Sequence, residues 1–173
     1  MKYVIGLALF LALANCCGAQ TYISFVPSLT NSPGTIAEKA NLSLEVGRQW
    51  DVFSLGADIG KTSLGKSGSR DTTLYLEVRP NLNVFQVGKF TNTLTPGIGC
   101  IFNSRENLMT ELTSGIEYAY NPWFHLNIYF GTYYYSGIYS ASNVTFFGLS
   151  IMYFLKPYTP KGLLNNATTK SAQ

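Results

Sequence analysis

The sequence predicts a closed, all-β barrel of eight antiparallel up-and-down strands that crosses a membrane with its strands. Three observations predict this fold class. Apolar and polar residues alternate with a period of two, charged residues make up only 12% of the chain, and tight connections alternate with long ones. Successive side chains of a strand point to opposite faces, so the alternation describes a sheet with one apolar and one polar face.

The first four expected strands cover residues 21–29, 39–48, 51–61 and 72–85. The first is the weakest, because it is short and contains Pro27. In residues 53–60 the odd-numbered positions are apolar and the even-numbered ones are Ser, Gly or Asp. Residues 74–84 alternate most clearly, with apolar residues and one proline at even-numbered positions. Each pattern fits a strand that separates an apolar from a polar environment.

The last four expected strands cover residues 92–102, 107–119, 123–135 and 144–155. Cys100 falls on the apolar side of its strand, where a lone thiol is a small hydrophobe. In residues 124–131 apolar residues alternate with His125, Asn127, Tyr129 and Gly131. Most of the eight segments reach the roughly 9–11 residues that a tilted strand needs to cross a bilayer.

The connections support an even number of strands. The segments NSPGTIAE, TSLGKSGSRD, NSRE and SGIYSASN are long, whereas tight turns are expected at residues 49–50, 86–89 and 120–122. Short turns on one side and longer loops on the other are typical of membrane barrels. Both ends of the barrel domain, residues 20–155, then lie on the side of the tight turns.

Composition favours a membrane over water. A soluble domain devotes about a quarter of its residues to charge, twice the 12% found here. Beyond the N-terminus no apolar run approaches the roughly 18 residues of a spanning helix. Aromatic residues near strand ends suit the headgroup level, namely Trp50, Tyr118, Tyr120, Trp123, Tyr133, Tyr134 and Tyr135. The alternative is a soluble secreted barrel whose apolar face lines a site for a lipophilic ligand.

The N-terminus predicts export. Lys2, an apolar run over residues 4–14 and small residues up to Ala19 have the layout of a secretory signal peptide, residues 1–19. Two alternatives remain, a retained anchor or a lipidated Cys16, although Asn15 departs from the small residue expected before such a cysteine. The tail, residues 156–173, has a composition typical of disorder.

The segments GIGCIF, TSGIEYAYNPWFHLNIYFG and FFGLSIMYF, together with the eight alternating strands, resemble the small outer-membrane β-barrel superfamily of Gram-negative bacteria, of the OmpA and OmpX type. The resemblance covers about residues 21–155. It implies a monomeric outer-membrane protein with a structural or surface-interaction role. Its partners would be outer-membrane lipid and, through residues 62–71 and 136–143, envelope or external molecules.

A lipid-modifying enzyme is the alternative within this superfamily. The lipid A deacylase family carries a His, one residue and a Ser on one strand. Here Asn127 occupies the serine position after His125, which argues against this activity. His125 shares the inward side with Glu117 across a tight turn, so the pair is expected to form an interior ion pair. We therefore assign no catalytic residue.

The inward side is expected to hold an interior charge network. Its members are Glu45, Asp58, Glu77, Arg79, Glu111, Glu117 and His125. Because an eight-stranded barrel is only wide enough for its own side chains, we expect no open pore. Acids outnumber bases, so some carboxyl groups should share protons, with Arg79 bridging to Glu45 or Glu77.

Other classes of site are absent from the sequence. It holds no phosphate-binding loop, no clustered Cys or His with metal-ligand spacing, and a net charge of only +3. We therefore expect no cofactor, no metal and no nucleic-acid partner. With Cys16 and Cys17 in the signal peptide, Cys100 has no intrachain partner for a disulfide.

Overall fold

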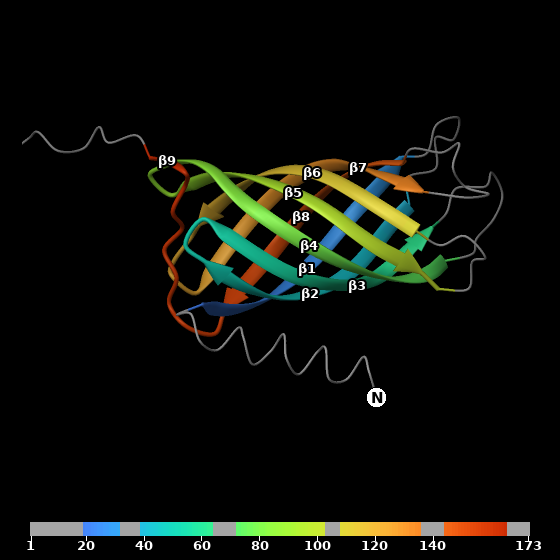
Figure 1. The fold of residues 1–173 in the computed structure, drawn as a ribbon, viewed down its shortest axis with the longest axis horizontal. Helices are drawn as coiled ribbons and strands as arrows, with labels where there is room; N and C mark the ends of the chain where they lie inside the picture. Colours follow the sequence, from blue (N-terminus) through green and yellow to red (C-terminus); the bar gives the residue numbers. More distant parts are fainter. Residues whose placement is uncertain (1–18, 32–38, 64–71, 103–107, 136–143, 166–173) are drawn as a thin grey trace, which may run out of the picture.

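The computed structural model describes residues 19–31, 39–63, 72–102, 108–135 and 144–165. Eight of its strands form a closed antiparallel barrel, in which each strand pairs with the next and β1 pairs with β8 (Figure 1). The strands are β1 (Gln20–Asn31), β2 (Lys39–Trp50), β3 (Phe53–Ser63), β4 (Thr72–Val87), β5 (Phe90–Ile101), β6 (Leu108–Ala119), β7 (Phe124–Tyr135) and β8 (Val144–Phe154). The predicted fold class is confirmed.

The strand limits differ little from those expected. β1 has 12 residues despite Pro27 and is as long as its neighbours. The first tight turn lies at residues 51–52 and not at residues 49–50, because the ladder continues to the pair of Trp50 with Phe53. The Gln49 side chain supports this turn by donating to the carbonyls of Asp51 and Phe53, both at 3.1 Å. Asp51 and Gly88 have positive φ angles of 30° and 58°. These values suit the sharp reversals at their turns.

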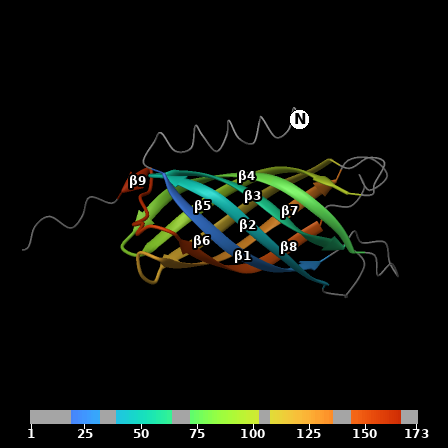
Figure 2. The ribbon, with the colours of Figure 1, turned by 90° about the horizontal axis from the view of Figure 1, so that it is seen from below.

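The tight turns gather at one end of the barrel, which we call the turn end; the opposite end is the loop end (Figures 1 and 2). Both the start of β1 and the end of β8 lie at the turn end, since Tyr22 pairs with Phe154. The expected signal peptide, residues 1–19, and the loop segments 64–71 and 136–143 lie almost wholly outside the described residues. No described helix is long and apolar enough to cross a membrane.

Every strand turns a row of apolar side chains outward. Phe130 is 65% exposed and Ile116 is 56% exposed. Equivalent positions on the other strands include Phe25, Leu44, Ile59, Leu76, Ile98 and Leu149. We call this surface the apolar belt. It contradicts the alternative of a soluble barrel with its apolar face inward, because the polar side of each strand faces the lumen.

The lumen has two unlike halves. At the loop end it is filled by an apolar cluster of Val26, Tyr75, Ile101, Met109, Tyr129, Tyr133, Tyr135, Val144 and Phe146. The middle and the turn end hold most of the buried polar and charged groups. Tyr133 and Tyr135 were expected among the headgroup-level aromatics; they point inward instead, because they share the parity of His125 along β7.

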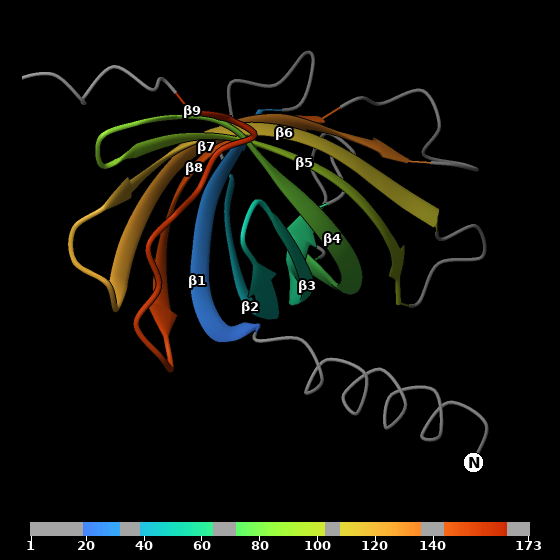
Figure 3. The ribbon, with the colours of Figure 1, turned by 60° about the vertical axis from the view of Figure 1, so that its left-hand side comes forward.

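The chain continues past β8 as an ordered segment, residues 156–165, which we call the strap. It ends in β9 (Leu164–Asn165), which pairs in parallel with Phe85 and Gln86 of β4. Since β4 and β8 lie on opposite sides of the ring, the strap crosses the turn end (Figure 3). The expectation of a disordered tail is therefore wrong for residues 156–165; residues 166–173 lie outside the described part.

The strap docks beside a β-bulge in β4. The register between β4 and β5 shifts between Asn83 and Phe85. Close to this bulge, the Asn83 carbonyl accepts the amide of Leu163 at 3.0 Å. A Cβ on Gly162 would lie 2.7 Å from the Gln86 nitrogen, so glycine permits the close approach.

Candidate functional site

The lumen brings the expected charged residues together around Arg79. Its guanidinium donates to Glu45 Oε2 and to Glu111 Oε1, each at 2.8 Å. Glu45 lies on β2 and Glu111 on β6, two strands to either side of β4. Arg79 therefore bridges Glu45 and Glu111. The sequence predicted a bridge to Glu45 or Glu77; Glu45 is a partner, whereas Glu77 is not.

Two glycines make room for the acidic side chains around Arg79. A Cβ on Gly56 would lie 2.1 Å from Glu45 Oε1, and a Cβ on Gly97 would lie 2.1 Å from Glu77 Oε1. Gly56 pairs with Arg79 across β3 and β4. Inward glycines thus let long charged side chains lie flat across neighbouring strands, the alternation of small and large residues that a narrow barrel requires.

Tyrosine and threonine hydroxyls support the carboxylates. Tyr22 donates to Glu45 at 2.5 Å, Tyr75 donates to Asp58 at 2.7 Å, and Thr113 donates to Glu111. Glu77 is fully buried, and neither of its oxygens has a hydrogen-bond partner among the described residues. A buried carboxylate with no partner is costly, so Glu77 is the least compensated group in the network.

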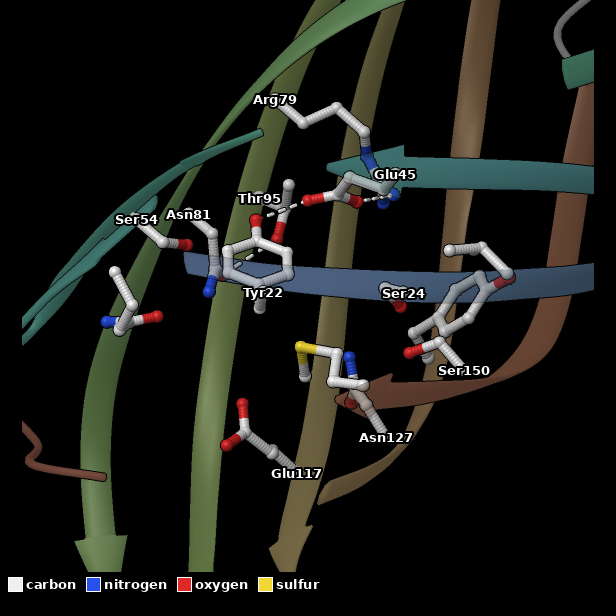
Figure 4. A pocket seen from close by; sticks show the side chains of 14 residues that line it. Tyr22, Ser24, Glu45, Ser54, Arg79, Asn81, Thr95, Glu117, Asn127 and Ser150 are labelled. Carbon is white, nitrogen blue, oxygen red and sulfur yellow. Dashed lines mark hydrogen bonds and ion pairs between the residues drawn. The ribbon is translucent and has the colours of Figure 1, made fainter. Parts of the chain in front are cut away.

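The middle of the lumen contains a cavity of about 40 Å³ (Figure 4). Tyr22, Ser24, Glu45, Arg79 and Asn127 are among the side chains that line it. This volume has room for a few water molecules, which such polar surroundings would hold. It is too small for a drug-sized ligand, whose pockets measure about 300–1,000 Å³.

His125 and Glu117 form a separate pair near the turn end. His125 Nδ1 lies 2.6 Å from Glu117 Oε1, and both side chains are buried. The imidazole packs against Phe154 and Tyr158, with ring centroids 4.7 Å and 5.7 Å away. His125 Nε2 has no hydrogen-bond partner in the described part of the chain. The described geometry therefore holds no hydroxyl nucleophile bonded to this histidine, and Tyr158 covers it.

Tyr158 of the strap closes the turn end. Its hydroxyl donates to the Asp51 carbonyl at 2.7 Å and accepts from Asn83 Nδ2 at 3.3 Å, while its amide donates to the Pro122 carbonyl at 2.8 Å. Burial raises the pKa of the Tyr158 phenol, so the hydroxyl keeps the proton that it donates. Lys161 adds an exposed ion pair to Asp51 at 2.9 Å.

Several residues of the site were not predicted from the sequence. Tyr22, Tyr75 and Tyr158 support or cover the network, yet each reads as an ordinary aromatic residue of a strand or tail. The inward parity of β1 and β4 could have identified Tyr22 and Tyr75. Among the residues that the structure describes, no group of three or more His, Cys, Asp or Glu side chains is placed to hold a metal ion.

Comparison with known proteins places the fold. No protein-family model matches the chain, and no curated protein matches it. Among solved structures, Neisserial surface protein A matches with a TM-score of 0.57 at 10% identity, covering 79% of this chain and 96% of the other.

Two further structures agree. The N-terminal β-barrel domain of Pseudomonas aeruginosa OprF matches with a TM-score of 0.53 at 10% identity, covering 78% of this chain and 99% of the other. A de novo designed protein, TMB2.3, matches with a TM-score of 0.50 at 14% identity over 81% of this chain and 98% of its own. At these identities the likeness concerns the fold, and this chain has the fold of the small eight-stranded outer-membrane β-barrels.

Proposed function

We propose that the protein is an exported outer-membrane barrel of a Gram-negative cell, without an open pore or an enzymatic activity, which acts as a structural or surface-interaction protein. The observation that carries this proposal is the orientation of the strands. Apolar side chains face outward on all eight strands, and the charged groups face a lumen that is closed at both ends.

The outward apolar belt supports the membrane part of the proposal. A contiguous apolar surface around a whole monomer is far larger than soluble proteins expose. The strand ladders are closed, so no sheet edge is left with unpaired backbone groups, as a bilayer requires. Trp123 and Tyr120 are exposed at the turn end, where aromatic residues meet lipid headgroups.

The two closures support the absence of a pore. At the loop end Tyr133 stacks on Phe146 with ring centroids 4.2 Å apart inside the apolar cluster. At the turn end Tyr158 packs on Phe154 with centroids 4.8 Å apart. Between them, among the residues that the structure describes, lies the cavity of about 40 Å³. A barrel filled in this way can contact other molecules through its outer loops and its apolar belt, but it provides no channel.

The surface role would then lie with the long connections at the loop end, residues 62–71 and 136–143. The turn end would face the periplasm. We expect any partner to bind these loops, and the barrel to anchor them.

Cysteine labelling in whole cells tests this placement. In a Cys100→Ser background, single cysteines would be introduced at Ser140, between β7 and β8, and at Asn121, in the turn between β6 and β7. A membrane-impermeant maleimide should label the first in intact cells and the second only after the outer membrane is permeabilised. Labelling of both in intact cells, or release of the protein in soluble form without detergent, would overturn the proposal.

A further inference from the structure

The described charges are sorted between the lumen and the turn end. Five buried acidic side chains face the lumen, and Asp51 is the one described acid that lies outside it. Asp51 is paired with Lys161 at 2.9 Å. The turn end also carries Arg48 at the end of β2, Lys89 in the turn between β4 and β5, and Lys156 at the start of the strap. The described turn end is therefore a basic rim.

The strap and two turns enclose a groove on this rim. The groove measures about 370 Å³ and is lined by Lys89, Tyr120, Pro122, Tyr158 and Pro160 among others. Its lining is mainly apolar, and Lys89 is its one cation. The Lys89 ammonium contacts the Tyr120 carbonyl at 3.4 Å, which engages one of its three donors.

The apolar belt continues onto the strap beside this groove. Leu164 pairs with Phe85 of β4, and Leu163 and Leu164 are 55% and 64% exposed. Val87, at the end of β4, is also exposed. An apolar surface that ends in a groove with a cation at its rim matches a molecule with acyl chains and an anionic head. The positive charge of Lys89 and the continuity of the groove with the apolar belt both favour a lipid over a peptide as the bound molecule.

We propose that the basic rim binds anionic phospholipid of the adjoining leaflet, with the phosphate against Lys89 and the glycerol region in the groove between the strap and the turns. Lys156 adds long-range attraction, and Leu163 and Leu164 lie in the hydrocarbon next to the bound lipid. This inference rests on the membrane placement proposed above. It assigns the strap a second role besides covering the lumen.

The two tryptophans of the chain provide the readout, since Trp50 and Trp123 both lie at the turn end. The full mature protein would be reconstituted into vesicles that contain brominated phosphatidylglycerol or brominated phosphatidylcholine. Bromine quenches tryptophan fluorescence on contact, so competition between the two lipids gives their relative affinity. We expect phosphatidylglycerol to bind several-fold more strongly at low salt and the preference to shrink in 1 M salt.

Two substitutions locate the site. Lys89→Gln should lower the preference for phosphatidylglycerol by about fivefold, the effect typical of one lysine near an anionic surface. The matched control is Lys61→Gln, an exposed lysine at the other end of β3, which should leave the preference unchanged. Because both lysines are exposed, neither substitution should affect folding.

The outcomes separate the two proposals. If neither brominated lipid quenches the tryptophans, the protein is not in the bilayer and the membrane placement fails. If both lipids quench equally, or if Lys61→Gln lowers the preference as much as Lys89→Gln, the membrane placement stands and the phospholipid site is overturned.

Discussion

The two ends of the lumen are closed by different means. At the loop end the strands close the barrel with their own inward side chains, such as Met109 and Phe146, which pack as a buried, mainly apolar cluster. At the turn end most inward side chains of the strands are polar, and Tyr158, which arrives from a strap that crosses the mouth, completes a small cluster with the inward Tyr22 and Phe154.

The difference follows from what each half contains. Apolar side chains fill space without needing partners, so the loop half closes with the strand pattern alone. The polar half leaves a cavity and buried atoms that have no hydrogen-bond partner within the described part of the chain, among them Glu77 Oε1 and Oε2, Asp58 Oδ1 and His125 Nε2. Such groups need shielding and compensation, which Arg79 provides from within and the strap from outside.

The largest effect is expected from the centre of the polar half. Arg79→Ala removes the guanidinium that bridges Glu45 and Glu111 and should lower the free energy of unfolding by about 3–5 kcal/mol at pH 7. The loss should shrink at lower pH, because protonation of the carboxyl groups removes the uncompensated charge. Denaturant unfolding of the reconstituted barrel at several pH values measures both.

A conservative variant separates charge from geometry. Arg79→Lys keeps one positive charge but lacks the planar fork that holds two carboxylates at once, so its stability should fall between those of wild type and Arg79→Ala. An Arg79→Ala barrel as stable as wild type at pH 7 would contradict the network.

The apolar half should respond to truncation without a pH dependence. Met109 is fully buried in the loop-end cluster, and Met109→Ala should cost about 2–4 kcal/mol through lost contacts and a cavity. The same unfolding measurement at pH 7 and pH 5 should give equal losses. A loss that varies with pH as strongly as that of Arg79→Ala would show that the two halves are not separate.

The close packing of Gly56 against Glu45, next to Arg79, predicts a smaller loss of stability on substitution. Gly56→Ala would place a methyl group against Glu45 and should destabilise the barrel by about 1–3 kcal/mol through overpacking. Ala57→Gly, at the neighbouring outward position, is the control for backbone effects and should cost about 1 kcal/mol or less. Equal costs at both positions would remove the argument for close packing at Gly56.

Much of this architecture follows from residue alternation. The parity in residues 74–84 is enough to assign Glu77 and Arg79 to one face, and the low charge content assigns that face to the lumen. The pairing of Arg79 with Glu111 and not with Glu77 depends on barrel closure, which brings β2 and β6 within reach of β4. Registers between strands set that distance, and a single strand carries no information about them.

The strap shows where composition misleads. Residues 156–173 together have a composition typical of disorder, but Tyr158 and Gly162 make specific contacts with the barrel. Their partners, Asp51, Asn83 and Gln86, lie more than seventy positions earlier in the chain. Contacts between residues so far apart in the chain leave no pattern in the local sequence. The bulge near Asn83, which accompanies the strap, has none either.

The smallest effect is expected at the strap hydroxyl. Tyr158→Phe keeps the ring on Phe154 and His125 but loses the hydrogen bonds to Asp51 and Asn83, at a cost of about 0.5–1.5 kcal/mol. Tyr158→Ala should in addition expose His125 to modification by diethylpyrocarbonate, whereas Tyr158→Phe should keep it protected. Rapid modification of His125 in the wild type would show that the strap does not cover the turn end.

Conductance in a planar bilayer tests the central claim that two unlike closures leave the barrel without a pore. The purified mature protein, inserted at low density, should give no steady unitary conductance, since the apolar cluster at the loop end blocks ions even when the strap moves. Tyr158→Ala should remain silent for the same reason. Steady, porin-like current steps from the wild type would contradict the account.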